Sequence, residues 1–306
     1  MRTHAHAHSH DHAHATADFG RAFAIGVTAN LAYVGIQAVY GVLAHSVALL
    51  ADAAHNLSDV LGLLLAWGAS VMARRLPSQN FTYGLRKSSI LAALGNAAFL
   101  LLATGAIAWE AVLRLFEPRS VEGATVMWVA LAGVAVNGGT ALLFMRGRKR
   151  DLNVRGAFLH LAADAVVSLG VVIAGLGIVY TGWLWLDPMT SLVISVVIVA
   201  GTWALLRDSI RMSLDAVPQG IDMAEVTAYL AQLPGVAAVH DLHVWAMSTT
   251  ETALTVHLLM PGGYPGDGFH GKLGDELHHR FGIGHATTQV ETDPGHPCTL
   301  APTSVV

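Results

Sequence analysis

Charged residues are scarce in this chain. Aspartate, glutamate, lysine and arginine together make up 12% of its 306 residues, about half of the ~25% that is typical of a soluble domain. The formal net charge is −4, and the lysines and arginines are bunched rather than spread, so no basic face for nucleic acid is expected. The composition therefore excludes an ordinary soluble domain and makes nucleic acid an unexpected partner.

Cysteine is nearly absent as well. The single cysteine, Cys298, leaves no intramolecular disulfide to form and does not reveal the redox compartment. The first 22 residues, MRTHAHAHSHDHAHATADFGRA, lack the short apolar core and the small-residue cleavage site of a signal peptide.

Enzyme motifs are also missing. No H-E-x-x-H motif of a metalloprotease occurs. The stretch GDGFHGKL, at 266–273, imitates a P-loop up to Gly271 and Lys272, but Leu273 stands where Ser or Thr must hold Mg²⁺. We therefore expect neither an enzyme nor a nucleotide cofactor, and any transport by this chain should be driven by a gradient.

Long hydrophobic runs are what the sequence does contain. Hydrophobic residues make up 54% of the chain, and a helix needs about 20 apolar residues to cross a bilayer. Six windows qualify, at approximately 22–44, 46–73, 88–109, 124–145, 156–180 and 187–206. They predict an all-α transmembrane domain of six helices over residues 20–207, preceded by a His-rich tail, 1–19.

Lysine and arginine are concentrated in the even-to-odd connections between these windows. They are Arg74, Arg75, Arg86 and Lys87 in one connection, and Arg146, Arg148, Lys149, Arg150 and Arg155 in the other. The first-to-second and fifth-to-sixth turns carry none. By the positive-inside rule this predicts a multi-pass protein of the cell's inner (plasma) membrane with both termini in the cytoplasm.

The pattern changes after Arg207. DMAEVTAYLAQLPG and GKLGDELHHRFG are helical in pattern, whereas VAAVHDLHVWAM, ETALTVHLLM and HATTQVETD alternate as half-buried strands do. The order α-β-β-α-β predicts a small α+β sandwich outside the membrane over residues 208–295, followed by a tail, 296–306.

Two of the apolar windows contain the same His-x-x-x-Asp motif. HNLSD places His55 four residues before Asp59, and HLAAD places His160 four residues before Asp164. Residues i and i+4 lie on one face of a helix. Two such helices, packed face to face, would gather two imidazoles and two carboxylates, which suits a tetrahedral divalent cation of the size of zinc.

The energetic cost of these residues argues for a function. An aspartate at the centre of a membrane helix costs about 2.5–3.5 kcal/mol, so Asp52, Asp59 and Asp164 together cost roughly 7–10 kcal/mol. A shared cation would offset that cost; the alternative is polar contact between helices without metal. Asp52 can share the face of the HNLSD pair, where we expect it to support the ligands or to lie on a proton path rather than to bind metal.

The sequence resembles the cation diffusion facilitator family of metal/proton antiporters. The resemblance rests on ALLADAAHNLSD, HLAAD, TYGLRKSSILAALGN, VHDLHVW and TVHLLM, which occur in this order along nearly the whole chain. It implies a homodimer in the membrane, with six helices per protomer and a cytoplasmic ferredoxin-like domain, that exports Zn²⁺ by alternating access. The implied transport site is His55, Asp59, His160 and Asp164, the two-His, two-Asp version of the zinc-preferring members.

The resemblance also implies a zinc site in the cytoplasmic domain at the dimer interface. His240, His257 and His270 match family positions, and Glu291 or Asp293 stands where relatives often have histidine. The fourth ligand therefore stays open, and Cys298 is either a thiolate ligand or an inert residue of the tail. In a regular strand His243 points away from the face of His240. We expect His278, His279 and His285 to be surface residues.

The N-terminal tail holds six of the 17 histidines. They are His4, His6, His8, His10, His12 and His14, and such a tract can capture zinc weakly or can be a solvated leader. Two other interpretations of the chain stay open. One is a membrane zinc sensor or storage protein that does not translocate metal; the other is the same transporter with Co²⁺ or Cd²⁺ as its substrate.

Overall fold

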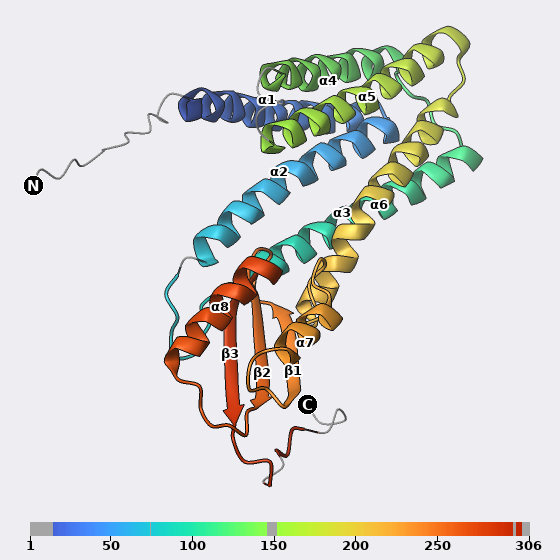
Figure 1. The fold of residues 1–306 in the computed structure, drawn as a ribbon. Coiled ribbons are helices and arrows are strands. Elements are labelled where there is room, and N and C mark those ends of the chain that lie inside the picture. The colour runs from blue at the N-terminus through green and yellow to red at the C-terminus, as the bar shows by residue number, and fades with distance from the viewer. Residues whose placement is uncertain (1–14, 74, 146–151, 296–297, 302–306) are drawn as a thin grey trace, which may run out of the picture. The chain divides into compact units, whose positions relative to one another are not determined.

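A computed structural model describes residues 15–73, 75–145, 152–295 and 298–301. Six long helices precede a small α/β domain along the chain (Figure 1). The helices are α1 (Ala15–Leu43), α2 (Val47–Ala73), α3 (Ser88–Phe116), α4 (Gly123–Phe144), α5 (Leu152–Thr181) and α6 (Leu186–Ser213). Each of the six predicted apolar windows thus coincides with a helix.

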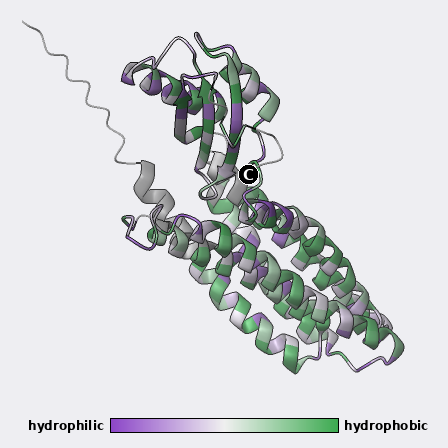
Figure 2. Ribbon diagram, turned by 90° about the horizontal axis from the view of Figure 1, so that it is seen from below, coloured by the Kyte–Doolittle hydropathy of each residue, from purple (hydrophilic) through white to green (hydrophobic). Residues whose placement is uncertain are grey.

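Several of these helices have the length and composition that a membrane requires. Within the described residues, four are long and apolar enough to cross one: Ser88–Phe116, Gly123–Leu143, Phe158–Thr181 and Leu186–Ser213. The described part of α1 contributes a shorter apolar helix, Val27–Leu43, and α2, which carries HNLSD, is 27 residues long. Hydrophobic residues cover the helices (Figure 2), and large ones such as Leu102, Val166 and Val196 face outward, as lipid-facing residues do.

The chain divides into two compact units, Met1–Leu63 with Phe99–Thr202, and Leu64–Ala98 with Trp203–Val306. In the first unit, glycines let α4 and α5 approach closely. A Cβ atom on Gly175 would lie 2.8 Å from the backbone nitrogen of Met127, and one on Gly123 would lie 3.0 Å from the carbonyl oxygen of Gly175. Small residues at such crossings are the usual means by which membrane helices pack.

The N-terminus of α2 is held by a buried carboxylate from α6. Asp187 accepts hydrogen bonds from the Ser46 hydroxyl and from the backbone nitrogen of Val47, the latter at 2.8 Å. A carboxylate at this position satisfies amide groups that the first turn leaves without partners and matches the positive end of the helix dipole. The contact fixes where α2, and therefore the HNLSD segment, begins.

The C-terminal domain has the predicted α-β-β-α-β order. Its elements are α7 (Met223–Ala231), β1 (Ala238–Ala246), β2 (Thr252–Leu259), α8 (Asp267–Phe281) and β3 (Ile283–Glu291). The strands form one sheet in the order β1-β2-β3, with β1 antiparallel and β3 parallel to β2. Leu230 of α7, Leu254 of β2 and Leu277 of α8 share one buried core, so both helices cover the same face of the sheet.

Two ion pairs join the start of α3 to the C-terminal domain within the second unit. Arg86 Nη1 lies 2.7 Å from Glu251 Oε1, and Lys87 Nζ lies 2.7 Å from Asp215 Oδ1. All four side chains are well exposed, so each pair contributes less than about 1 kcal/mol. They connect the residues just before α3 to the C-terminal domain and add little to the stability of the fold.

Candidate metal centres

The two His-Asp pairs of α2 and α5 meet in the first unit. His55 Nε2 lies 3.3 Å from Asp164 Oδ1 and 3.9 Å from Asp59 Oδ2. His160 Nε2 lies 3.2 Å from Asp59 Oδ2 and 3.6 Å from Asp164 Oδ2. Each imidazole therefore faces both carboxylates, one from its own helix and one from the opposite helix. We refer to His55, Asp59, His160 and Asp164 as the membrane cluster.

Three of the four ligands are spaced closely enough for one cation: His55, Asp59 and Asp164 each offer one atom within 4.8 Å of the other two, and His160 does not join this group. Zinc binds imidazole nitrogen and carboxylate oxygen at about 2.0–2.2 Å, and the edge of a tetrahedron with such bonds is about 3.3–3.6 Å. The four nitrogen-to-oxygen distances of the membrane cluster run from 3.2 to 3.9 Å. His160 would have to move closer to the other three residues to bind the same ion.

The membrane cluster is buried unevenly. The side chain of Asp164 is 5% exposed and that of His55 is 21% exposed, whereas that of His160 is 48% exposed. His55 Nδ1 is buried and forms no hydrogen bond within the described part of the chain. The cluster therefore has a buried side at Asp164 and an exposed side at His160.

Asp52 lies outside the membrane cluster. It is fully buried, and its Oδ2 accepts hydrogen bonds from Gln37 Nε2 of α1 at 2.6 Å and from Ser168 Oγ of α5 at 3.0 Å. These contacts occupy one carboxylate oxygen with neutral donors. That Asp52 supports the ligands or lies on a proton path stays a prediction.

A second cluster lies on the open face of the sheet in the C-terminal domain. Glu291 Oε1 lies 3.0 Å from His257 Nδ1, and Glu291 Oε2 lies 3.3 Å from His240 Nε2. The sulfur of Cys298 lies 3.5 Å from His257 Nδ1. One ligand atom from each of these four residues falls within 4.8 Å of the others. We refer to His240, His257, Glu291 and Cys298 as the cytoplasmic cluster.

The carboxylate of Glu291 is kept ionised by its neighbours in the cytoplasmic cluster. Burial raises the pKa of Glu291, but a hydrogen bond from Cys298 and the charge of His240 outweigh burial, so the pKa lies below its ordinary value. An ionised carboxylate beside two imidazoles and a thiol is an N2OS donor set that suits zinc.

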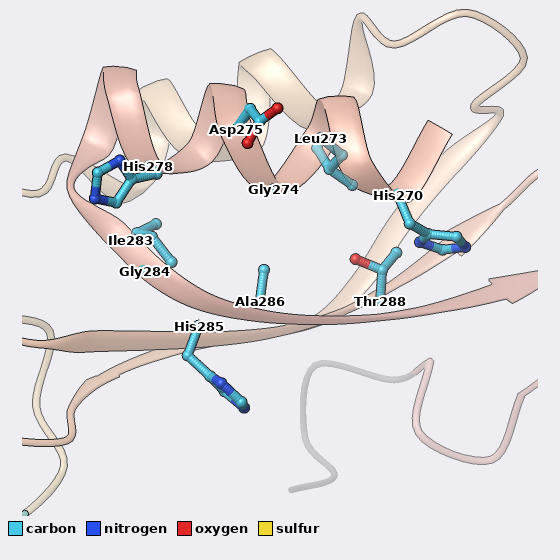
Figure 3. Close-up of a pocket in the computed structure, with 10 residues that line it drawn as sticks. All are labelled: His270, Leu273, Gly274, Asp275, His278, Ile283, Gly284, His285, Ala286 and Thr288. Carbon is cyan, nitrogen blue, oxygen red and sulfur yellow. The ribbon is translucent and has the colours of Figure 1, made fainter. Parts of the chain in front are cut away.

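Two predicted ligands lie apart from the cytoplasmic cluster in a single chain. His270 is on α8, which covers the opposite face of the sheet, and Figure 3 shows it near Thr288 at one end of a hollow between α8 and β3. This hollow has a volume of about 390 Å³. Asp293 is exposed beyond β3, and its Oδ1 accepts a hydrogen bond from the Gly295 backbone nitrogen. Of the two candidate carboxylates, the chain therefore brings Glu291 to the cluster.

A β-bulge in β1 corrects the expectation for His243. His240 pairs with His257 and His243 pairs with Thr255, so three steps along β1 oppose two along β2. Asp241 is the extra residue and adopts a left-handed φ of 49°. Because Thr255 and His257 share a face, His243 lies on the same face as His240 and not on the opposite one.

The bulge also brings an unpredicted carboxylate beside the cytoplasmic cluster. Asp241 Oδ1 lies 2.9 Å from His243 Nε2, and Asp241 Oδ2 lies 3.4 Å from His257 Nε2. The HDLH sequence contains both residues, but only a bulge puts them on one face with His257.

The remaining histidines divide between exposed and undescribed positions. His278, His279 and His285 are exposed, as predicted, and Figure 3 shows His285 pointing away from α8. His4, His6, His8, His10, His12 and His14 lie outside the described residues.

Long apolar helices with a His/Asp cluster, followed by an α/β domain with a second cluster, define a multi-pass membrane protein that handles a divalent metal. Comparison with known proteins gives the family. Residues 23–212 match the cation efflux transmembrane domain, and residues 218–293 match the cytoplasmic domain of cation efflux proteins. The chain belongs to the cation efflux family, so the predicted resemblance is confirmed; it is a transporter and not an enzyme.

Several curated relatives cover most of the chain. The zinc transporter ZitB of Escherichia coli K12 is 37% identical over 276 residues, which cover 90% of this chain and 87% of the relative. The cadmium, cobalt and zinc/H⁺-K⁺ antiporter of Bacillus subtilis is 33% identical over 85% of each chain. The metal cation efflux system protein CzcD of Cupriavidus metallidurans is 34% identical over 90% of this chain and 87% of the relative.

The lowered pKa of Glu291 leads to a prediction about stability. A depressed carboxyl pKa contributes stability above the unfolded-state value, about 4.5, and this contribution is lost as the pH falls through the folded-state value. We expect Glu291→Gln to lower the stability of the metal-free protein by about 1–3 kcal/mol at neutral pH, and the difference to vanish in acid. Thermal unfolding in detergent from pH 7 to pH 3 measures it.

Glu276→Gln is the control for this measurement, because Glu276 is an exposed glutamate of α8 outside the cytoplasmic cluster. A Glu291→Gln penalty that stays constant down to pH 3 would contradict the role assigned to its neighbours.

Proposed function

We propose that the protein exports Zn²⁺ from the cytoplasm in exchange for H⁺, with His55, Asp59, His160 and Asp164 as the transport site. One observation carries this assignment: two i,i+4 pairs, from two different membrane helices, place each imidazole 3.2–3.9 Å from both carboxylates. This spacing suits a single tetrahedral ion.

The activity of a cation efflux protein is the export of divalent metal by proton antiport. Relatives are named as transporters of zinc, of cadmium and of cobalt. Two imidazoles and two carboxylates favour zinc among the divalent ions, and cobalt and cadmium accept similar ligands. Zinc is therefore the proposed substrate, and Co²⁺ and Cd²⁺ are its competitors at the same site.

Acid-base chemistry of the ligands couples metal to protons. Zinc binds neutral imidazole and ionised carboxylate, so binding releases protons from the site and protonation releases the metal. With zinc bound, the two carboxylates of the membrane cluster balance the charge of the ion, and with zinc gone, protons replace it. A site that faces alternately a near-neutral cytoplasm and a more acidic outside then exchanges one for the other, by rocking of the helices around it.

The cytoplasmic cluster is proposed as a second zinc site that senses or captures metal. His240, His257 and Glu291 supply three ligands. The sulfur of Cys298 lies 3.5 Å from His257 Nδ1, which supports Cys298 as the fourth ligand. We propose that the protein is a homodimer in the inner (plasma) membrane, with both termini in the cytoplasm. In a dimer, His270 and Asp293 can reach this site from a second copy of the chain.

The transport site makes a direct prediction. We expect Asp59→Ala and Asp164→Ala each to lower zinc flux at least about 100-fold, because either change removes a ligand and leaves the bound ion with unbalanced charge. The measurement is zinc flux into proteoliposomes with an imposed pH gradient. Ser195→Ala, which removes a buried hydroxyl from α6, should transport as the parent does.

Zinc flux near the parental rate in either aspartate variant, with the protein correctly inserted, would refute the transport site. If neither the parent nor any variant shows zinc flux, although the parent binds zinc tightly, the protein binds zinc without transporting it.

The histidines of the N-terminal tail are proposed to capture zinc weakly for the transport site. Deleting residues 4–14 should raise the zinc concentration for half-maximal flux without lowering the maximal rate, because the tail would only concentrate the ion. The same proteoliposome assay measures both values. Identical concentration curves for the deleted and full-length chains would show that the tail is a solvated leader.

A further inference from the structure

Two polar atoms on neighbouring turns of α2 are buried and have no hydrogen-bond partner among the residues that the structure describes. They are Oδ1 of Asp52 and Nδ1 of His55. One is an acceptor, and the other can be a donor. Residues three apart lie on the same helix face, so both atoms belong to the face that carries the membrane cluster.

The tautomer of His55 follows from its other ring nitrogen. Nε2 faces the carboxylates of the membrane cluster, at 3.3 Å from Asp164 Oδ1, and must offer its lone pair there to bind metal. The ring proton of neutral His55 then sits on Nδ1. A metal-binding histidine nearly always donates this second N–H to a carboxylate, a carbonyl or water, and Asp52 is the carboxylate on its face.

The other oxygen of Asp52 is already held. Oδ2 accepts from Gln37 Nε2 at 2.6 Å and from Ser168 Oγ at 3.0 Å, and Gln37, Asp52 and Ser168 are all fully buried. The titratable groups nearest to Asp52 are Tyr33 of α1, His55 of α2 and Asp164 of α5. None of these is a lysine or arginine, so in the described chain the carboxylate is held by neutral donors and its free oxygen remains for His55.

We propose that Asp52 is a positioning residue that accepts a hydrogen bond from His55 Nδ1, so that Asp52, His55 and the metal ion form a relay. The proposal rests on the proposed function, because it presumes that His55 binds the transported metal. Gln37 and Ser168 hold the carboxylate in place from α1 and α5. The relay fixes His55 in its metal-binding tautomer and raises the basicity of Nε2.

The relay makes the two halves of the membrane cluster different. His55 is mostly buried and depends on Asp52 for its second hydrogen bond, whereas the side chain of His160 is 48% exposed and can use water. The α2 half is therefore preorganised, and the α5 half is adaptable.

Metal binding tests the relay independently of transport. Zinc affinity is measured by competition with a chelator, and the ligand field by the d–d absorption of bound Co²⁺. All measurements use a parent protein that carries His240→Ala and His257→Ala and lacks residues 4–14. The membrane cluster is then the one proposed metal site that remains. Asp164→Ala serves as the reference for loss of the site.

Asp52→Asn keeps the size of the side chain, but an amide cannot accept hydrogen bonds both from His55 and from Gln37 and Ser168. If its amide NH2 faces His55 it demands the wrong tautomer, and if it faces Gln37 and Ser168 it opposes their donors. We expect zinc affinity to fall about 10–100-fold, with an altered Co²⁺ spectrum. Ser168→Ala, which removes one of the groups that hold Asp52, should weaken binding by a smaller factor, and Ser195→Ala should not change it.

Zinc affinity within about twofold of the parent in Asp52→Asn, with an unchanged Co²⁺ spectrum, overturns the relay. If Asp52→Asn does not fold, the zinc affinities of Ser168→Ala and Gln37→Leu test the proposal instead. Parental zinc affinity in both variants overturns it, and weaker zinc binding in both supports it. Parental binding in Asp164→Ala would show that the transport site itself is wrongly assigned, and the relay falls with it.

Discussion

The cost of an ionised carboxylate inside a membrane helix is the constraint on which this structure depends. The two helices that meet in the membrane cluster carry three aspartates, Asp52, Asp59 and Asp164, each costing about 2.5–3.5 kcal/mol when unpaired. Asp59 and Asp164 face two imidazoles, and a divalent cation bound between the two carboxylates would cancel both charges. Asp52 is instead held by neutral donors from α1 and α5. The same cost explains why metal transport can be coupled to protons. When the metal ion leaves the site, protons must neutralise the carboxylates, and when the metal ion binds, it replaces those protons.

Two contacts help to fix the helices that carry the membrane cluster, one at the start of α2 and one between α5 and its neighbour α4. Asp187 of α6 binds the first turn of α2, and Gly123 and Gly175 let the backbones of α4 and α5 approach to contact distance. Both features lie in the same compact unit as the membrane cluster. A metal site requires its ligands to be positioned to within about half an ångström. Fixed helix contacts of this kind are needed, because a small shift of α2 or α5 separates the two His-Asp pairs.

The repeated i,i+4 spacing allowed the membrane cluster to be predicted, because helix geometry alone places such pairs on one face. Other features depend on contacts that spacing does not encode. The partners of Asp52 come from α1 and α5, far away in sequence. The position of His243 was predicted wrongly, because strict alternation assumes a regular strand and Asp241 forms a bulge. Cys298 follows the last strand, and its approach to His257 depends on how the chain turns after Glu291.

X-ray absorption of bound zinc is the most direct test of the central claim, that one ion is held by both His-Asp pairs. The measurement uses the protein with His240 and His257 replaced by alanine and residues 4–14 removed, loaded with one equivalent of zinc. The account predicts four nitrogen or oxygen neighbours at about 2.0–2.2 Å, with the outer-sphere signal of two imidazole rings. A six-coordinate shell, a sulfur neighbour, or the signal of only one imidazole would contradict it.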